Sequence, residues 1–292
     1  MNIRFVSFED IDKNKWNGTV HFAQNSNVYG YYWYLKSVIR EWDALVEDDY
    51  HSVMPLPRYK WSSFQLNLLP GLGAYSVNAV SETRALAFYE LFKKYCPGFS
   101  YIFNPGISSK LIGVRTTSLT PGFQFSINLN HSYQDICNKY SPAFNYMLSK
   151  HDLTNYTLGS QEKPEVFLQN SHLSKENKNI LYRLYYNAIQ RSIGWHSKVR
   201  NLKTENDTSA FFISDASNIY LIFSNQTDTA STLILIDTFL QSNAGKPRSL
   251  RLGSNKKLAE IFGAESTSFL EHSGSFWGLS GIIKKVMPRF FE

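Results

Sequence analysis

A helix followed by a tight hairpin, at residues 25–60, constrains this chain more than any other stretch. Apolar spacing predicts a helix from about residue 27 to 41, and a strand at 44–46 then leads into an acidic turn. The returning strand, 51–56, runs through Pro55. Because proline has no N–H to donate to a ladder, we expect this strand to lie at a sheet edge or to splay from a neighbour.

Strands and helices alternate in two similar runs along the chain. Beyond the hairpin, the patterns predict a strand at 64–69, one long helix at 132–150 and an apolar helix at 230–242. This order indicates an α/β fold with mixed sheets. A restart of the pattern near residue 120 divides it into an N-terminal domain, 1–119, and a C-terminal domain, 120–292.

The charge of the chain allows an anionic partner. Its 292 residues have a formal net charge of +6, which permits binding of nucleic acid, a phosphate-bearing cofactor or a membrane surface. The basic residues are spread along the chain rather than gathered in a tail, so a solvated surface is the alternative.

Cysteine usage and hydropathy bear on the compartment. Cys96 and Cys137 are the only cysteines, too few for a disulfide framework, so a reducing compartment fits. No segment approaches the roughly 18 apolar residues of a membrane span, and the N-terminus lacks a signal-peptide pattern. We therefore expect a cytoplasmic protein without a membrane span.

Residues 33–57 combine rare residue types in a specific order: W-Y-L, then W-D-A-L-V, D-Y and M-P-L-P. This segment resembles a bacterial group of GNAT-like, FemABX-related proteins, and weaker matches follow in order at 129–141, 210–237 and 252–264. The resemblance implies two tandem GNAT-like acyltransferase domains with a cleft between them. It also implies transfer of an acyl or aminoacyl group, from a CoA or tRNA donor, to an amine of a small molecule or peptide.

Acyl transfer from a thioester needs a cradle for the phosphates of the donor and a backbone donor for the thioester carbonyl. Backbone N–H groups at a helix N-terminus bind anions. The turn that opens the predicted 230–242 helix contains Thr227 and Thr229, which are candidate contacts for acyl-CoA. An ordinary helix N-cap is the alternative interpretation.

A second candidate donor contact comes before the next predicted helix. Gly253, Ser254 and Asn255 combine a small residue with two capping side chains, which suits a donor or substrate contact and equally suits a plain N-cap. Arg251 either pairs with an anionic group of the ligand or lies at the surface.

The acceptor candidates lie in the first half of the chain. Tyr34 and Trp42 either line an acceptor groove or pack in the core. Asp49 and Tyr50 match the D-Y pair of the family, and Asp49 either holds a cationic amine or is a solvated turn former. Arg58 either binds phosphate or lies at the surface.

Other chemistry has no support in the sequence, and two alternatives to an enzyme stay open. No histidine pair has metal-ligand spacing, and neither a nucleophile elbow nor a P-loop occurs, so we expect no metal and assign no catalytic residue. Residues 250–252 replace an acidic D-F-E of the family, and 225–230 contain no glycine. These departures favour a catalytically inactive GNAT-fold protein that binds a ligand or partner. Binding of tRNA through the positive charge is the third hypothesis.

Overall fold

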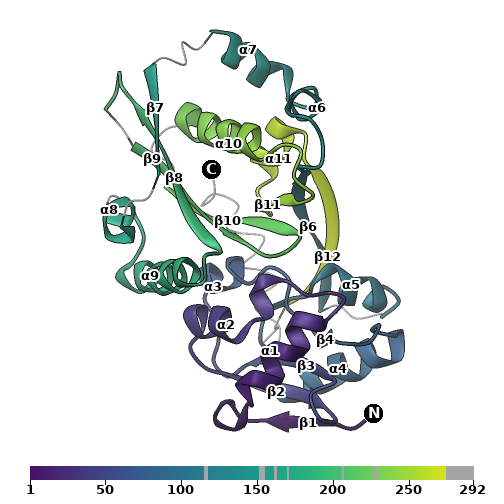
Figure 1. The fold of residues 1–292 in the computed structure, drawn as a ribbon. Helices are drawn as coiled ribbons and strands as arrows, with labels where there is room; N and C mark the ends of the chain where they lie inside the picture. Colours follow the sequence, from purple (N-terminus) through teal and green to yellow (C-terminus); the bar gives the residue numbers. More distant parts are fainter. Residues whose placement is uncertain are drawn as a thin grey trace, which may run out of the picture. The chain divides into compact units, whose positions relative to one another are not determined.

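The computed structural model describes residues 1–114, 118–150, 155–160, 163–169, 171–205, 207–225 and 229–273. Their contacts form two compact units: unit 1 is Met1–Gly122 with the residues from Ser268 on, and unit 2 is Phe123–Thr267 (Figure 1). The unit boundaries fall inside strands β6 (Leu119–Asn128) and β12 (Glu265–His272). The sequence-based division at residue 119 stays a prediction.

Unit 1 contains an antiparallel sheet in the order β1-β2-β3-β4. Its strands are β1 (Ile3–Val6), β2 (Trp42–Glu47), β3 (Ser52–Pro57) and β4 (Tyr75–Ser76). Strand β4 pairs only with Ser52 and Val53, the first two residues of β3. Among the described strands, none therefore pairs with this edge of β3 where its prolines lie. Side chains complete the hydrogen bonding there: the Tyr101 hydroxyl donates to the Pro55 carbonyl at 2.9 Å.

The helix predicted at 27–41 is shorter than expected. A 3-10 turn, η2 (Val28–Gly30), precedes α2 (Tyr32–Val38), with extended backbone between them. Gly30 ends the 3-10 turn, and a Cβ there would lie 2.5 Å from the ring of Tyr75, so this close packing requires glycine. The Gly30 carbonyl also accepts a hydrogen bond from the Trp16 indole at 2.9 Å.

The strand predicted at 64–69 is wrong, because these residues form the helix α3 (Ser63–Asn67). A capping box between Ser62 and Gln65 begins this helix, and its S-x-x-Q spacing is a helix-start signal. The remaining elements of unit 1 are η1 (Phe8–Asp10), α1 (Lys13–Phe22), α4 (Glu82–Tyr95), β5 (Tyr101–Ile102) and α5 (Pro105–Leu111). Their core is mostly aromatic, and Trp16, Phe88, Phe92 and Phe103 are at most 1% exposed.

Unit 2 is built on six strands in the order β6-β11-β10-β9-β8-β7. The strands not yet given are β7 (Tyr156–Ser160), β8 (Gly194–Asn201), β9 (Asp207–Ser214), β10 (Asn218–Asn225) and β11 (Ser249–Gly253). Among these six described strands, β10 and β11 are the parallel pair, and the other neighbours are antiparallel. Strand β8 was not predicted, although Trp195, Ser197 and Val199 alternate along one of its faces.

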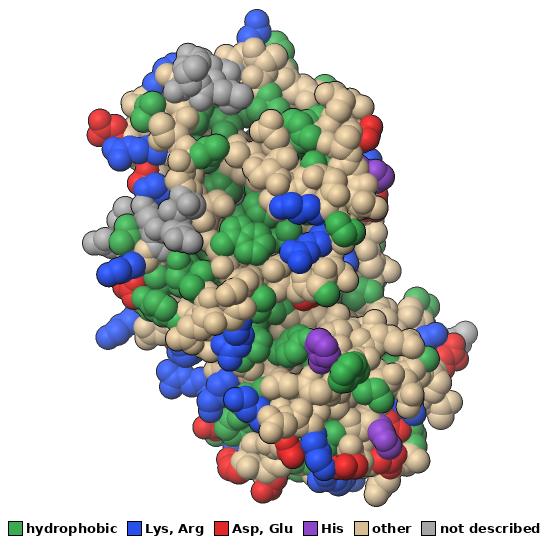
Figure 2. All heavy atoms as spheres, in the orientation of Figure 1, with side chains coloured by type: hydrophobic (Ala, Val, Ile, Leu, Met, Phe, Trp, Pro, Cys, Tyr) green, Lys and Arg blue, Asp and Glu red, His purple; other side chains and the backbone are tan. Residues whose placement is uncertain are grey.

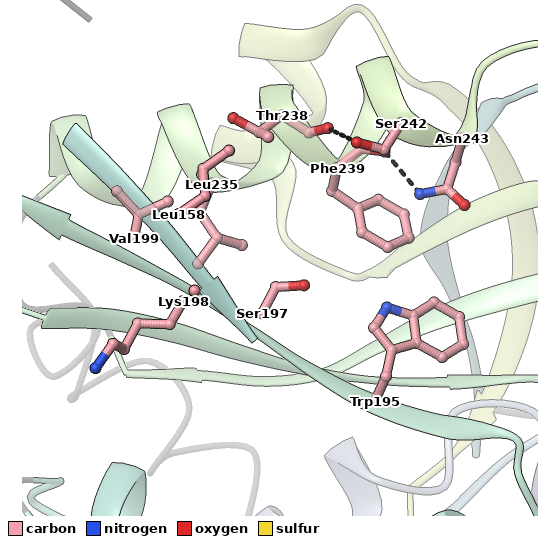
Figure 3. Close-up of a pocket in the computed structure, with 11 residues that line it drawn as sticks. Leu158, Trp195, Ser197, Lys198, Val199, Leu235, Thr238, Phe239, Ser242 and Asn243 are labelled. Carbon is pink, nitrogen blue, oxygen red and sulfur yellow. Dashed lines mark hydrogen bonds between the residues drawn. The ribbon is translucent and has the colours of Figure 1, made fainter. Parts of the chain in front are cut away.

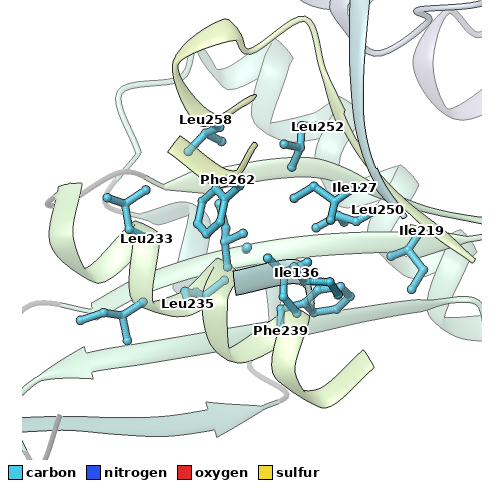
Figure 4. Packing of buried hydrophobic residues seen from close by; sticks show 14 of the residues in the cluster. Ile127, Ile136, Ile219, Leu233, Leu235, Phe239, Leu250, Leu252, Leu258 and Phe262 are labelled. Carbon is cyan, nitrogen blue, oxygen red and sulfur yellow. The ribbon is translucent and has the colours of Figure 1, made fainter. Parts of the chain in front are cut away.

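The helices of unit 2 are α6 (Tyr133–Cys137), α7 (Pro142–Lys150), α8 (Pro164–Gln169), α9 (Lys175–Gln190), α10 (Thr229–Asn243) and α11 (Lys256–Phe262). Residues of α6, α7, α10 and α11 share one hydrophobic cluster with the sheet (Figure 4). The single helix predicted at 132–150 is wrong. The chain turns between α6 and α7, where the Ser141 N–H donates to the Ile261 carbonyl at 2.9 Å and Pro142 starts a new helix.

A buried carboxylate fixes α10 in place. Asp237 is 9% exposed and accepts hydrogen bonds from the hydroxyls of Tyr133 and Tyr140, each at 2.8 Å. Burial raises the pKa of Asp237, although both phenols stabilise its charged form and oppose that shift. The triad therefore ties α10 to the α6 region of the same unit and positions the helix on its sheet.

Candidate functional site

The parallel strands β10 and β11 separate after three residue pairs. Their register runs from Asn218 with Ser249 to Tyr220 with Arg251, and β10 continues without this partner to Asn225. On its other side, the pairing of β10 with β9 is interrupted by a bulge after Leu221. Beyond Tyr220, β10 therefore does not pair with β11 in the described part of the chain.

A small cavity of about 80 Å³ lies at the N-terminus of α10. It is lined by Thr229, Thr232, Leu233, Asn255, Lys257, Leu258 and Ile261. Helix α10 has 15 residues, so its first turn presents the positive end of a helix dipole, and Lys257 adds a full positive charge. Both features favour an anionic group at this place.

The structure brings two predicted donor residues together at this cavity, Thr229 and Asn255. Thr229 is the first residue of α10, while the Asn255 side chain accepts the Leu258 N–H at 3.0 Å and caps α11. The capping role that the sequence left open for Asn255 is therefore present, and the residue also lines the cavity. Thr227 lies outside the described residues.

The other predicted donor residues lie along β11 and just after it. Gly253 has a left-handed φ of 64°, which glycine adopts without strain, and Ser254 is exposed. The Arg251 side chain donates to the Asn218 side-chain oxygen at 2.7 Å, across the parallel pair. Arg251 is thus held within the sheet at the point where β10 and β11 separate.

Sequence reasoning missed Lys257, which lines the cavity, and Ser224, which lies on β10. Lys257 follows another lysine at a helix start, a pattern typical of a solvated face. The Ser224 hydroxyl on β10 is buried and has no hydrogen-bond partner in the described part of the chain. A buried hydroxyl without a partner is unfavourable by about 1–3 kcal/mol, so Ser224 is a candidate contact for a ligand. No sequence pattern signals such an orphaned hydroxyl.

The fold of this chain is similar to that of known structures. No protein-family model and no curated protein sequence matches it. FemX aligns over 99% of this chain and 100% of its own, with 8% identity and a TM-score of 0.58. The chain has a FemX-like fold. The C-terminal domain of an Agrobacterium fabrum protein named as a lysylphosphatidylglycerol synthetase also aligns, over 89% of this chain and 92% of its own, with 9% identity and a TM-score of 0.51.

At these identities the likeness concerns the fold. The α/β fold with mixed sheets expected from the sequence is confirmed, and this fold is similar to that of FemX. Within this FemX-like fold, the separated parallel pair and the α10 N-terminus belong to unit 2.

Two of the predicted acceptor residues, Tyr34 and Trp42, have no exposed surface in the FemX-like fold. The Tyr34 hydroxyl donates to the Leu68 carbonyl at 2.9 Å. The Trp42 ring packs against Tyr32 and Trp16, with ring centroids 4.8 and 6.0 Å apart. In this conformation both side chains fill the core of unit 1, which is the packing alternative that the sequence left open.

The remaining acceptor candidates are engaged by neighbouring groups of unit 1. Lys15 pairs with Asp49 at 2.6 Å, which lowers the pKa of Asp49. The Tyr50 hydroxyl accepts the Asp12 N–H at 2.8 Å.

Arg58 is held by acidic side chains of the same unit. Its guanidinium pairs with Glu9 at 2.6 Å and approaches Glu41 at 3.6 Å. Arg58 follows the Trp42–Pro57 end of the β2–β3 hairpin, whereas Asp49 and Tyr50 lie in the turn at its other end. The structure therefore does not gather these candidates into one pocket.

Charge and hydropathy add three observations. Lys and Arg side chains lie at many points of the face drawn in Figure 2, with acidic side chains among them. Among the described residues, no group of three His, Cys, Asp or Glu side chains is placed to hold a metal ion. The described helices also include none that is both long and apolar enough to cross a bilayer.

Proposed function

We propose that this protein is an N-acyltransferase, which moves an acyl or aminoacyl group from an activated donor to an amine of a small molecule or peptide. The observation on which the proposal rests is the separation of β10 from β11 beside the N-terminus of α10, in a FemX-like fold. The α10 start offers an anion site, to which Lys257 adds a positive charge.

The donor binds with its phosphate-bearing end at the α10 cavity. Lys257, Thr229 and the first N–H groups of α10 are the groups that contact the phosphates, which suits acyl-CoA as the donor. The activated acyl group then extends along β10 past Tyr220, where backbone N–H groups polarise its carbonyl. The hydroxyl of Ser224, which lacks a partner in the described structure, hydrogen-bonds the donor or acceptor on the same strand.

The reaction is direct attack of the acceptor amine on the donor carbonyl carbon. The new C–N bond forms, the C–S bond of the thioester breaks, and the sulfur leaves as a thiolate that takes up the proton lost by the amine. The protein contributes by positioning the two reactants and by stabilising the oxyanion with fixed backbone dipoles. No covalent intermediate on the protein is required by this scheme.

Two classes of donor combine a phosphate-bearing carrier with an activated acyl group. Acyl-CoA fits the cavity of about 80 Å³ at α10 through its phosphates. Aminoacyl-tRNA is the second donor class, and the net charge of +6 favours it.

The experiment measures acyl transfer from each donor with the full chain. Acetyl-CoA is incubated with a panel of primary amines and free thiol is measured. Separately, aminoacyl-tRNA is tested for amine-dependent deacylation. We expect amine-dependent release from one donor, and Ser224→Ala to reduce its rate by about tenfold, the equivalent of about 1.4 kcal/mol. Binding of a donor without any amine-dependent release contradicts the proposal and favours an inactive ligand-binding protein.

A further inference from the structure

A second cavity, of about 200 Å³, opens between α10 and the edge of the unit 2 sheet formed by β7 and β8 (Figure 3). Its lining takes α10 residues from Leu235 to Asn243, whereas the donor cavity takes Thr229 to Leu233. The two cavities share no lining residue. The second cavity therefore lies outside the proposed donor site.

The walls of this cavity are apolar. Leu158 on β7 faces Val199 on β8, and Leu235 and Phe239 approach from α10. Leu158 lies on the same face of the sheet that α10 covers at the neighbouring strands, yet its side chain is 63% exposed. Part of this apolar face is therefore open at the β7 edge. Trp195 lies nearly parallel to Phe239, with ring centroids 6.0 Å apart and an angle of 14°.

Two hydrogen-bond donors point into the apolar space. Trp195 and Ser197 lie two residues apart on β8, so their side chains share one face of the sheet. Figure 3 shows the indole nitrogen of Trp195 and the hydroxyl of Ser197 directed toward the centre of the cavity. Neither side chain has a hydrogen-bond partner among the described residues, so both are available to a ligand.

The other polar groups of the lining are already engaged. The Thr238 hydroxyl donates to the Ile234 carbonyl at 2.8 Å, and the Ser242 hydroxyl donates to the Thr238 carbonyl at 2.9 Å. The Lys198 ammonium is turned away from the cavity and pairs with Asp207 at 3.1 Å (Figure 3). No charged side chain of the described lining therefore faces the cavity, which disfavours an ionised ligand because its desolvation is not compensated.

We infer that this cavity is a binding site for a small neutral aromatic compound with a carbonyl group. The ring lies among Leu158, Leu235 and Phe239, and the carbonyl oxygen accepts hydrogen bonds from Trp195 and Ser197. A few polar groups in an otherwise apolar pocket are the usual pattern of small-molecule sites. The inference is independent of acyl transfer, because it involves neither the donor cavity nor an amine.

The test follows the indole N–H of Trp195 by NMR, with benzamide as the probe. The full chain, labelled with ¹⁵N at its 6 tryptophans, gives one indole signal for each, and Trp195→Phe identifies the signal of Trp195. Benzamide should shift this signal saturably and leave the others in place. Benzoate has the same ring with a carboxylate, and we expect it to bind at least about tenfold more weakly.

Two variants of the cavity and one control sharpen the test. Ser197→Ala removes one of two hydrogen bonds and should weaken benzamide binding by about threefold to tenfold. Leu158→Phe fills the cavity from an exposed position and should abolish binding. The control Leu202→Phe changes a side chain that is 49% exposed and outside the cavity, and should bind as the parent does.

The remaining indole signals report whether each variant keeps its fold. Absence of a saturable Trp195 shift up to the solubility limit of benzamide overturns the inference. Equal affinity for benzoate overturns it too, and so does unchanged binding by the folded Leu158→Phe protein.

Discussion

The conspicuous residues of the sequence lie in unit 1, whereas the candidate functional site of the structure lies in unit 2. Unit 1 contains the conspicuous segment 33–57, with its rare residue types, yet its named side chains are buried or ion-paired. Unit 2 has few conspicuous residues, yet it contains the separated pair β10 and β11, a cavity at a helix start and an orphaned buried hydroxyl. Rare residues therefore mark packing in one unit, while backbone geometry marks the candidate site in the other.

The physical reason is that packing an aromatic core and binding an anion place different demands on side chains. A tightly packed aromatic core accepts only a few shapes, so Trp16 and Trp42 stand out in the sequence. An anion site at a helix N-terminus uses backbone N–H groups, which every residue except proline supplies. A sequence pattern therefore reports the first task more clearly than the second.

The largest expected effect tests whether the conspicuous segment of unit 1 serves packing. Trp42 has no exposed surface and contacts three other aromatic rings, so Trp42→Ala should lower the free energy of unfolding by about 3–5 kcal/mol. Urea denaturation measures this change. The control Tyr59→Ala removes a side chain that is 62% exposed and should have little effect. Full stability of Trp42→Ala would contradict a packing role.

The next effect concerns the donor cavity of unit 2. Lys257→Ala removes the cation beside the α10 N-terminus and should weaken acetyl-CoA binding by about tenfold or more, as for a charge-assisted contact of about 1.5–3 kcal/mol. Calorimetric titration measures the affinity. The neighbouring Lys256 is 79% exposed and pairs with Glu260, so Lys256→Ala is the matched control and should bind as the parent does. Equal losses in both variants would show a general charge effect instead of a site.

The pH dependence of stability tests the role of Asp237, the buried carboxylate that holds α10 in place. The pKa of Asp237 is raised by burial, so its contribution to stability is present at low pH and is lost as pH rises above the ordinary value of 3.8. Asp237→Asn keeps acceptors for Tyr133 and Tyr140 without the charge. The stability of the parent relative to this variant should fall by on the order of 1 kcal/mol between pH 3 and 7. Urea denaturation across that range measures it, and a constant difference or the opposite slope would refute this reasoning.

The smallest effect concerns the hairpin turn of unit 1. Lys15 lowers the pKa of Asp49, so this pair contributes stability at neutral pH that is lost as pH falls through the lowered pKa. Both side chains are largely exposed, at 47% and 73%, and the effect of Asp49→Asn should be smaller than that of Asp237→Asn. Denaturation at pH 7 and pH 3 checks this, with donor affinity unchanged. A large loss of acceptor or donor binding would move the functional site toward unit 1.

The sequence predicted the fold class and the principal hairpin because both depend on local patterns. The patterns at residues 44–46 and 51–56 indicated β2 and β3. The errors came from contacts distant in sequence. Tyr75 packs closely against Gly30 beside the break in the predicted helix, and Ile261 accepts the Ser141 N–H where the chain turns.

The candidate site was predictable only in part, for the same reason. Thr229 and Asn255 stood at helix starts, where capping residues are recognisable. Their meeting at one cavity with Lys257 depends on how α10 and α11 lie on the sheet, which no local pattern contains. The Ser224 hydroxyl lacks a hydrogen-bond partner among the described residues, and this depends on distant packing that no local pattern contains.

Hydrogen–deuterium exchange with and without acetyl-CoA tests the difference between the units most directly. We expect acetyl-CoA to slow exchange in β10 beyond Tyr220, at the start of α10 and around Lys257, and to leave the Trp42–Pro57 hairpin unchanged. Protection of the hairpin without protection of the α10 start would contradict the assignment of the donor site to unit 2.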